Sequence, residues 1–350
     1  MTLIGICRHK LLIINLFTMR INRKLLNLEN KISNSIFFST KKKKASLHEP
    51  IFFNREKKYL TECIKTTFVS TSGFFISKFE NKIKEFTKIK DAIAVITGTS
   101  ALEICIRVLG AKKNDEILIP TLTFVGTANA VVHAGCTPHF IDSDLNNLGI
   151  DVDKLEDYLN RISKIKNNKL FNKITKKRIF GIIPVHVFGH MTNMEKLIKI
   201  AKKFKLKIIE DAAEALGSYY KNKHAGTFGD LGVISFNGNK TITSGGGGVI
   251  LSKNKNITSQ IRHLISTSKL KHKWKFLHDK VGWNFRMTNL SAAVGLAQIE
   301  NIKKILFFKK KITNRYINFY KKENEIKFFQ QPKNCKSNYW LNTILVENIS

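Results

Sequence analysis

A lysine stands between a short apolar segment and four consecutive glycines in "SFNGNKTITSGGGG", residues 235–248. Lys240 could hold a phosphate, form a covalent bond through its amine, or lie in solvent. A phosphate loop of the nucleoside triphosphatase type needs Gly directly before the lysine and another Gly five residues earlier, so that backbone N–H groups wrap the phosphate. Because Asn239 precedes Lys240 and the glycines follow it, the spacing favours a Schiff base with a carbonyl group over a phosphate loop.

A Schiff-base lysine that works with pyridoxal 5'-phosphate (PLP) needs a phosphate cradle, a carboxylate beside the pyridinium nitrogen, and a surface that stacks on the ring. Thr99 and Ser100 open a candidate helix directly after a strand, where unpaired N–H groups and the helix dipole favour a phosphate. Asp211 ends an apolar strand, where an ionised carboxylate would keep a pyridine nitrogen protonated. Phe124 follows "PTLT" and could cover the ring face.

Each of these residues also has a purely structural explanation. "GTSA" is a common helix start, in which Thr99 or Ser100 would be the capping residue. An Asp after an apolar strand often caps a helix or a turn, and Phe124 could belong to a core. Chemistry is favoured because all of them, together with Lys240, follow predicted strands of one sheet, and ligands of open α/β sheets bind at the carboxyl ends of the strands.

The elements that would position these residues alternate between strand and helix from about Ser46 onward. This alternation predicts an α/β fold with a mostly parallel sheet and helices on its faces. Apolar residues at helical spacing predict helices at 100–109, 124–134 and 193–204, and long helices from Asn289, before a last strand in "YWLNTILV". The seven expected strands of the sheet are at 92–97, 116–120, 137–142, 180–185, 206–211, 231–236 and 247–251.

The net charge of +34, from 60 Lys and Arg against 26 Asp and Glu, raises the question of a nucleic-acid partner. The lysines are spread along the whole chain and only residues 41–44 form a dense run, so we expect no nucleic-acid partner. The apolar stretches are shorter than the roughly 20 residues that span a bilayer, so no membrane partner is expected. The five cysteines are isolated, with no spacing that suits zinc, which predicts a cytoplasmic protein without a metal site.

Residues 1–45 differ from the rest of the chain, because they carry many basic residues and a single acid, Glu29. Organelle-targeting peptides are also basic, contain Ser and are poor in acids. A misassigned start or a nonspecific basic tail is the interpretation that we favour, and we expect this extension to be disordered.

In combination, the motifs resemble the DegT/DnrJ/EryC1/StrS family of PLP-dependent sugar-nucleotide aminotransferases, from about Ser46 to "YWLNTIL". The form is most similar to transaminases of the bacillosamine, legionaminate and perosamine type. The resemblance implies fold type I, with a three-layer α/β/α large domain at 46–305 and the start of a small α+β C-terminal domain at 306–350. It rests on "GTSALEICIRVLG", "IPTLTFVGTANAV", "PVHVFG", "IIEDAAEALGSYY", "GTFGDLGVISFNGNKTITSGGGGVI" and "GWNFRMTNLSAAVGLAQIE".

The resemblance also implies roles around the cofactor. Lys240 would form the Schiff base with PLP and act in catalysis with Asp211, whose carboxylate would pair with the pyridinium nitrogen. Glu214 would lie near the ring hydroxyl, and Phe124 would stack on the ring. Glycines 245–248 would leave room for backbone and substrate beside the cofactor. The phosphate would be held by Thr99, Ser100 and Ser235.

Two further implications concern the assembly and the substrate. Asn284 would reach the phosphate of a neighbouring subunit, which implies a homodimer with shared active sites. His186 and Arg286 are the candidates for substrate contacts. The reaction implied is the transfer of an amino group from glutamate to the 4-keto-6-deoxy sugar of a nucleotide sugar, in amino-sugar and surface-polysaccharide biosynthesis.

Three alternatives stay open at this stage. A PLP-dependent sugar dehydratase of the same fold carries His in place of the lysine, which Lys240 argues against. A basic binding or regulatory protein would account for the charge. Family members usually continue for some tens of residues beyond the position of Ser350, so an inactive or truncated member is also an expectation, and in that case the "YWLNTILV" strand would be unpaired.

Overall fold

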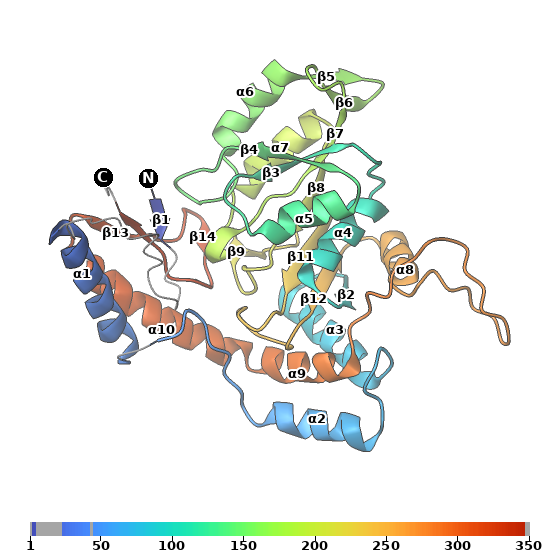
Figure 1. The fold of residues 1–350 in the computed structure, drawn as a ribbon, viewed down its shortest axis with the longest axis horizontal. Coiled ribbons are helices and arrows are strands. Elements are labelled where there is room, and N and C mark those ends of the chain that lie inside the picture. The colour runs from blue at the N-terminus through green and yellow to red at the C-terminus, as the bar shows by residue number, and fades with distance from the viewer. Residues whose placement is uncertain (1, 5–22, 43–44, 347–350) are drawn as a thin grey trace, which may run out of the picture.

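A nine-stranded sheet lies at the centre of the molecule, between layers of helices (Figure 1). The structure is a computed structural model that describes residues 2–4, 23–42 and 45–346. Seven strands follow one another across the sheet in the order β2-β12-β11-β8-β7-β3-β4. They are β2 (Asp91–Val95), β3 (Glu116–Pro120), β4 (Thr137–Ile141), β7 (Arg178–Ile182), β8 (Lys207–Asp211), β11 (Leu231–Ser235) and β12 (Gly248–Ser252).

Each of the seven strands expected from the sequence is present, and the α/β prediction of a mostly parallel sheet is confirmed. Strands β11, β8, β7, β3 and β4 run parallel to one another, whereas β12 is antiparallel to both β2 and β11. The hairpin β5 (Ser163–Lys166) and β6 (Lys169–Asn172), which was not expected, extends the sheet beside β7. Its turn, Asn167–Asn168, has left-handed backbone at both residues, a conformation that Asn tolerates and that suits a tight hairpin.

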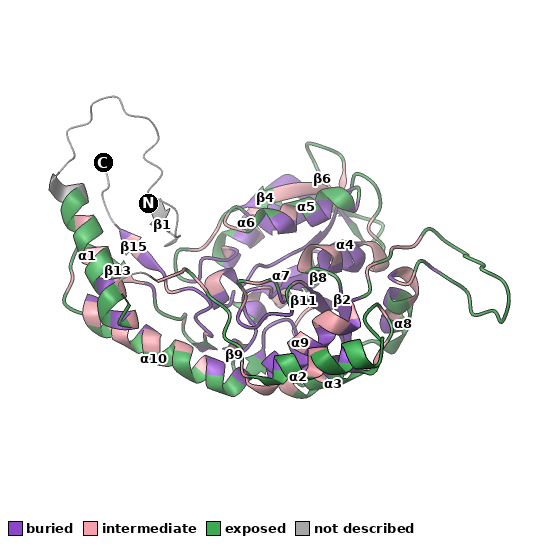
Figure 2. Ribbon diagram, turned by 60° about the horizontal axis from the view of Figure 1, so that its bottom comes forward, coloured by how far each residue is buried: buried purple, intermediate pink, exposed green. Residues whose placement is uncertain are grey.

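Two apolar clusters cover the two faces of the sheet, because successive side chains of a strand point to opposite sides. Along β8, Ile209 belongs to the cluster under α4, α5 and α8, and Ile208 to the cluster under α3, α7 and α9. Figure 2 shows the buried strands between helices whose outer surfaces are exposed. These helices are α3 (Phe74–Thr87), α4 (Gly98–Val108), α5 (Val125–His133), α6 (Val152–Ile162), α7 (Met194–Lys203), α8 (Lys255–Leu264) and α9 (Asn289–Glu300), with α2 (Arg55–Lys65) against α9.

A second, smaller group of elements contains the end of the chain and part of its beginning. It comprises α10 (Ile302–Tyr320), β13 (Ile326–Phe328), β15 (Ile344–Val346), β1 (Thr2–Ile4) and α1 (Arg23–Thr40). The strand expected in "YWLNTILV" is limited to β15, and it is not unpaired, since β13 and β1 flank it on both edges. The preceding residues fold instead over the Lys240 loop.

Helix α1 lies in the extension for which the sequence predicts disorder, so the structure differs from that prediction at residues 23–40. Leu28 and Ile32 of α1 pack with the apolar cluster of α10 and β13. The Tyr320 hydroxyl lies 2.7 Å from Ser35 Oγ. A basic composition does not reveal this packing, because the partner helix of α1 is almost 300 residues away in the sequence. Residues 5–22 and 43–44 of the extension are outside the described residues.

Two small elements complete the edge of the molecule near the carboxyl ends of the strands. The short strands β9 (Tyr219–Tyr220), β10 (Lys223–His224) and β14 (Cys335–Lys336) form a three-stranded sheet, and η1 (Val187–Gly189) is a single 3-10 turn. Within the residues that the structure describes, no helix combines the length and the apolar character needed to cross a membrane.

Candidate active site

Lys240 lies in the loop that follows β11, and only 11% of its side-chain surface is exposed. Its Nζ is 3.4 Å from Glu214 Oε1 and 4.1 Å from the centre of the Trp340 ring. The indole N–H of Trp340 donates to the carbonyl oxygen of Asn239 at 2.7 Å, which ties the same loop to the C-terminal part of the chain. The amine is therefore enclosed by a carboxylate and an aromatic face, so the solvent-exposed alternative does not hold.

Asp211, the last residue of β8, is 5% exposed and has its carboxylate against α5. The Thr127 hydroxyl on α5 donates to Oδ2 at 2.7 Å, and the N–H of Ala213 donates to Oδ1 at 3.1 Å. Two neutral donors orient the carboxylate without cancelling its charge. It is therefore suited to pair with a cationic ring nitrogen.

Glu214, in the turn after β8, is the carboxylate nearest to Lys240. The N–H of Phe188 donates to its Oε2 at 2.8 Å, while Oε1 faces the lysine. Burial raises the pKa of Glu214 above its usual value, although the Lys240 ammonium and the Phe188 N–H act in the opposite direction. A carboxyl group that holds its proton more firmly than usual, next to an amine, can take part in proton exchange with it.

The N-terminus of α4 is where the sequence predicts a phosphate cradle, which stays a prediction, and its capping residue differs from the expected one. Thr97, rather than Thr99 or Ser100, caps the helix, since its hydroxyl accepts from the N–H of Ser100 at 3.0 Å. The first N–H groups of the helix, those of Gly98 and Thr99, have no partner within it. A Cβ on Gly98 would lie 3.0 Å from Ser235 Cβ, so Ser235 borders the cradle as expected and the glycine keeps the approach open.

Phe124 stands at the start of α5 and is 67% exposed, so the alternative that it fills the core is wrong. A Cβ on Gly126 would lie 2.9 Å from the Phe124 ring and 3.0 Å from Thr99 Oγ1. The ring and this hydroxyl therefore border the same small space beside the cradle. An exposed aromatic ring in this position is available to cover a planar ligand.

The expectation that His186 contacts the substrate needs correction. The side chain is completely buried, and its Nε2 lies 3.1 Å from Glu210 Oε2. Glu210 is equally buried and also accepts from the N–H groups of residues 226, 228 and 229. A ring with no exposed surface cannot reach a substrate, so His186 positions a buried carboxylate instead.

Asn284 and Arg286 are both exposed. The backbone of Arg286 bridges Val95 of β2, which places it beside the strand that leads into α4. Among the described residues, no hydrogen bond or ion pair joins either side chain to Lys240. Their roles in substrate and neighbouring-subunit contacts therefore stay predictions.

The four glycines after Lys240 divide into two pairs. A Cβ on Gly248 would lie 2.8 Å from the carbonyl group of Thr97, so this glycine lets β12 approach the start of α4, and Gly247 has a φ of +147° that other residues rarely adopt. Gly245 and Gly246 would meet nothing within 4 Å. Open space is thus left at the first pair, where clearance beside the cofactor stays a prediction, while the second pair serves close packing.

Three residues of the site were missed by the sequence analysis: Thr127, Asn338 and Trp340. Thr127 stands one helical turn after Phe124, so helical periodicity could have found it. Asn338 Nδ2 lies 2.9 Å from the carbonyl oxygen of Glu214 and 3.1 Å from Thr241 Oγ1, so it ties the two catalytic loops together. No local signal reveals Asn338 and Trp340, because their partners lie about 100 residues away and "NYW" reads as part of a strand.

No cluster of His, Cys, Asp and Glu in the described part of the chain has the arrangement of a metal site. The chemistry that the geometry supports therefore centres on one buried amine, two carboxylates and a helix N-terminus at a single edge of the sheet.

Comparisons with known proteins agree with this arrangement. The model of the DegT/DnrJ/EryC1/StrS aminotransferase family matches residues 51–349. GDP-perosamine synthase of Escherichia coli O157:H7 is 36% identical over 301 residues, which cover 85% of this chain and 77% of that enzyme. UDP-4-amino-4,6-dideoxy-N-acetyl-beta-L-altrosamine transaminase of Campylobacter jejuni serotype O:23/36 is 34% identical over 267 residues, 76% of this chain and 66% of that enzyme.

Solved structures show the same fold. PseC of Helicobacter pylori, an aminotransferase involved in the biosynthesis of pseudoaminic acid, superposes with a TM-score of 0.78 at 26% identity, over 87% of this chain and 78% of that one.

Proposed function

The chain belongs to the DegT/DnrJ/EryC1/StrS aminotransferase family, and on that premise we propose that it moves an amino group from glutamate to the 4-keto-6-deoxy sugar of a nucleotide sugar, for amino-sugar and surface-polysaccharide biosynthesis. It is a PLP-dependent aminotransferase, as its family is. The names of the E. coli and C. jejuni relatives, which contain GDP-linked and UDP-linked sugars, support a nucleotide sugar as the acceptor.

The observation that carries the proposal is the convergence of Lys240, Glu214 and Asp211 at the carboxyl edge of one sheet. The residues present fit PLP. The Asp211 carboxylate has one donor on each oxygen and retains acceptor positions for a cationic nitrogen. The cradle at the N-terminus of α4 offers N–H groups to a phosphate, and the Lys240 amine has no second carboxylate partner among the described residues.

When bound, PLP supplies an electron sink that stabilises negative charge on the carbon next to the transferred nitrogen. Lys240, in its neutral form, would remove the proton from the α-carbon of the amino donor and deliver it to the carbon on the other side of the transferred nitrogen. In the second half of the reaction, it would move a proton in the opposite direction, onto the sugar carbon that receives the amino group. The Trp340 ring and the Glu214 carboxylate hold the amine close to the path of this proton.

Asp211 would lie beside the ring nitrogen, where attraction to a carboxylate would favour the protonated form of that nitrogen. Thr127 fixes the direction of the carboxylate from α5. Phe124 would exclude water from one face of the ring. The phosphate would be held by Gly98, Thr99 and Ser100 through the N–H groups and hydroxyls of the first turn of α4, with Ser235 beside them.

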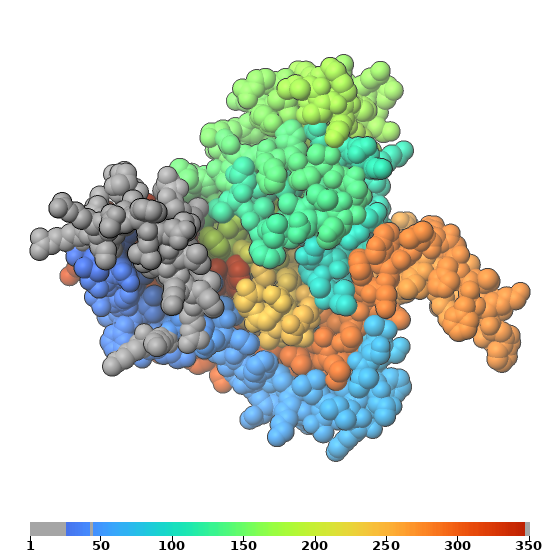
Figure 3. All heavy atoms as spheres, in the orientation of Figure 1, coloured from blue at the N-terminus to red at the C-terminus, as the bar shows by residue number. Residues whose placement is uncertain are grey.

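A homodimer with shared sites is part of the proposal. The connection between α8 and α9 projects from the body of the protein as an arm, residues 265–288 (Figures 1 and 3). Trp274, Phe276 and Val281 on this arm are each at least 79% exposed, and such a cluster of apolar side chains favours a protein contact. Asn284 follows them directly, so an arm laid on a second copy would bring this amide towards the other subunit.

The test is an incubation of the purified, PLP-loaded protein with glutamate and a panel of 4-keto nucleotide sugars, followed by product mass. We expect one sugar of the panel to gain an amino group. Replacement of Lys240 by Arg should lower the rate by at least about a thousandfold, since the guanidinium stays protonated and cannot move the proton. The matched control is Lys255→Arg, at an exposed lysine of α8. Full activity of Lys240→Arg would refute the catalytic assignment, and a silent panel with a folded, PLP-loaded dimer would refute the sugar assignment.

A further inference from the structure

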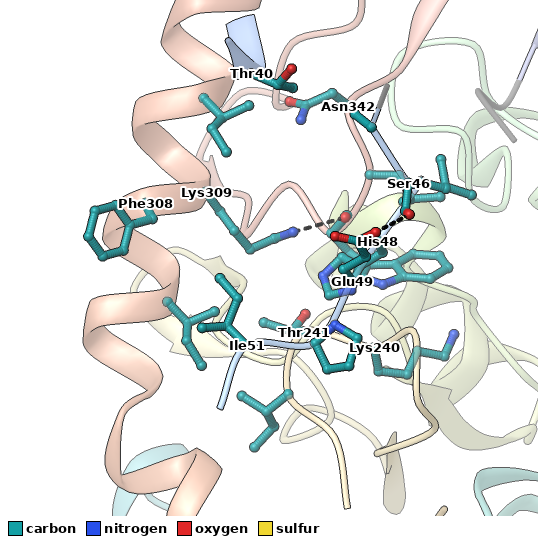
Figure 4. Close-up of a pocket in the computed structure, with 18 of the residues that line it drawn as sticks. Thr40, Ser46, His48, Glu49, Ile51, Lys240, Thr241, Phe308, Lys309 and Asn342 are labelled. Carbon is teal, nitrogen blue, oxygen red and sulfur yellow. Dashed lines mark hydrogen bonds between the residues drawn. The ribbon is translucent and has the colours of Figure 1, made fainter. Parts of the chain in front are cut away.

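A cavity of about 340 Å³ lies behind the loop that carries Lys240 (Figure 4). Its walls are the end of α1, the segment 45–53, the loop 240–243, the middle of α10 and residues 340–342. In the close-up the side chain of Lys240 is directed away from the cavity, whereas that of Lys309 enters it from α10. Lys240 itself is among the residues that line the cavity, so the cavity adjoins the candidate active site.

Lys309 is a cation in this cavity without an acidic partner. Its Nζ donates to the carbonyl oxygen of Trp340 at 3.0 Å, and no Asp or Glu among the described residues forms an ion pair with it. An ammonium group has three N–H donors, so two are left for other acceptors. Burial lowers the pKa of Lys309 to about 8. The side chain is half-buried, and a cation partly withdrawn from water without an anion is costly, so a bound anion would lower that cost.

His48 adds a second unused polar group to the same end of the cavity. Its Nδ1 is buried and has no hydrogen-bond partner. Burial, and then the positive charges of Lys309 and Lys240, lower the pKa of His48 to about 3, so the ring is neutral and can donate or accept. Glu49, on the same segment, is directed to Ser46 in Figure 4 rather than to Lys309.

Most of the lining surface is apolar and would receive an apolar body. Two other lysines of the lining have acidic partners, since Lys42 lies 3.9 Å from Glu49 and Lys240 lies 3.4 Å from Glu214. Lys309 and the neutral imidazole therefore match a single negative charge attached to a hydrocarbon. The aliphatic side chains are Ile36, Ile51, Ile242, Ile305, Ile312 and Leu341.

We propose that this cavity binds a small organic monocarboxylate, whose carboxylate pairs with Lys309 and whose apolar body lies among the isoleucines of α1, the Lys240 loop and α10. The cavity adjoins the proposed aminotransferase site at Lys240, but its ligand does not depend on the identity of the sugar. Trp340 contacts both lysines, because its carbonyl oxygen accepts from Lys309 and its ring lies against Lys240. A carboxylate that pairs with Lys309 would therefore compete with this carbonyl oxygen and affect a residue that contacts the catalytic amine.

The experiment uses the full chain loaded with PLP and measures heat on titration with octanoate at pH 7. We expect saturable binding of octanoate, at least tenfold tighter than that of octanol, which has the same chain and no charge. Lys309→Met keeps the aliphatic stem and should weaken octanoate binding by at least about tenfold, which corresponds to about 1.4 kcal/mol. The matched control is Lys311→Met, two residues further along α10 at an exposed position. This variant should bind octanoate as the unmodified protein does.

Several results would overturn the proposal. The first is equal affinity for octanol and octanoate, and the second is unchanged octanoate affinity in Lys309→Met. The third is affinity for inorganic phosphate as high as that for octanoate, because such a site would bind anions without requiring an apolar body. If Lys309→Met does not fold, Ile312→Trp decides the question, because it fills the apolar end without touching the lysine. Unchanged octanoate binding by this variant would also exclude the cavity. Amino-group transfer to the sugar panel is a separate measurement, so failure of one proposal is distinguishable from failure of the other.

Discussion

Glu210 and Asp211 are consecutive carboxylates at the end of β8. They point to opposite faces of the sheet and have different numbers of hydrogen-bond donors around them. Glu210 has no exposed surface and accepts from His186 and from three backbone N–H groups. Burial alone would raise the pKa of Glu210, but the hydrogen bonds from His186 and the backbone hold it below its usual value. Asp211 accepts from only two donors, Thr127 and Ala213.

A carboxylate has about four acceptor positions. On the closed face they are filled by the chain itself, which fixes the loop 226–229 against β8. On the open face half of them are left, at the edge where ligands of α/β sheets bind. Burial and charge are therefore poor guides to a catalytic carboxylate, and the number of unfilled acceptor positions separates the two more clearly.

Replacement of Asp211 by Asn should have the largest effect on catalysis with little effect on folding. The amide keeps the shape and can still accept from Thr127, but it loses the charge that holds the ring nitrogen protonated. We expect amino-group transfer to slow by about a thousandfold, or about 4 kcal/mol, while the free energy of unfolding in urea changes by less than about 1 kcal/mol. A variant with normal turnover would show that the open face does not carry the chemistry.

Replacement of Glu210 by Gln should show the reverse. One of the two carboxylate oxygens becomes an NH₂ group that faces a backbone N–H or the His186 ring, which leaves buried donors without acceptors. We expect a loss of about 2–4 kcal/mol in the free energy of unfolding, measured in urea. The matched control is Glu195→Gln, which breaks an exposed ion pair with Lys221 and should cost less than about 1 kcal/mol. Equal stability of the two variants would remove the contrast between the faces.

The Asn338→Ala variant tests whether the loops that carry Glu214 and Lys240 are positioned by the sheet alone or also by the C-terminal part of the chain. The side chain lies between the carbonyl oxygen of Glu214 and the hydroxyl of Thr241. Its loss leaves buried acceptors unpaired, at a cost of about 1–3 kcal/mol of stability. Since both catalytic loops are released, we also expect the dissociation constant of PLP to rise several-fold, measured by absorbance titration. Asn256→Ala, at an exposed asparagine, should change neither quantity.

The His190→Phe variant extends the comparison of buried polar side chains to one whose ring nitrogens have no hydrogen-bond partner among the described residues. Both ring nitrogens of His190 lack a hydrogen bond, and the ring packs against Phe329 and Tyr339. Burial lowers the pKa of His190 to about 3. As pH falls below about 6.5, this histidine becomes protonated in the unfolded chain, whereas in the folded chain it stays neutral until about pH 3. The free energy of unfolding therefore decreases as the solution becomes more acidic.

The Phe variant removes this loss at one position. We expect the fall in unfolding free energy between pH 7.5 and pH 5.5 to be smaller by about 1 kcal/mol than in the unmodified protein. The slope should not vanish, because burial also lowers the pKa of His48 to about 3 and that of His224 to about 4. His133→Gln, at an exposed histidine, should keep the original slope, and an unchanged slope for His190→Phe would contradict the assignment.

The parts of this molecule that could be predicted from the sequence are those encoded over short distances. The strands could be located because apolar runs end in turn residues, and Lys240, Asp211 and the start of α4 could be placed because each follows such a run. The helix cap was assigned two residues too late, since Thr97 and Thr99 are equivalent by composition. The role of His186 was wrong because "HVFGH" follows a strand just as the catalytic segments do, and only the fold shows that its ring lies inside the protein.

Long-range contacts could not be predicted. Trp340 and Asn338 reach the catalytic loops from about 100 residues away, and α1 packs on α10 from the opposite end of the chain. In each case the stabilising free energy comes from tertiary packing, which the local periodicity of the sequence does not indicate.

The place of β2 in the sheet has a consequence for the order in which the protein is assembled. Strand β2 leads directly into the proposed phosphate cradle of α4, and the only strand paired with it among the described residues is β12, the last strand of that sheet to be synthesised. The strands β3, β4, β7, β8 and β11 can pair as soon as they emerge, whereas β2 must wait for the chain to pass Ser252. The cofactor cradle is therefore among the last parts of the sheet to be fixed, and a nascent chain that stops before β12 should not retain PLP.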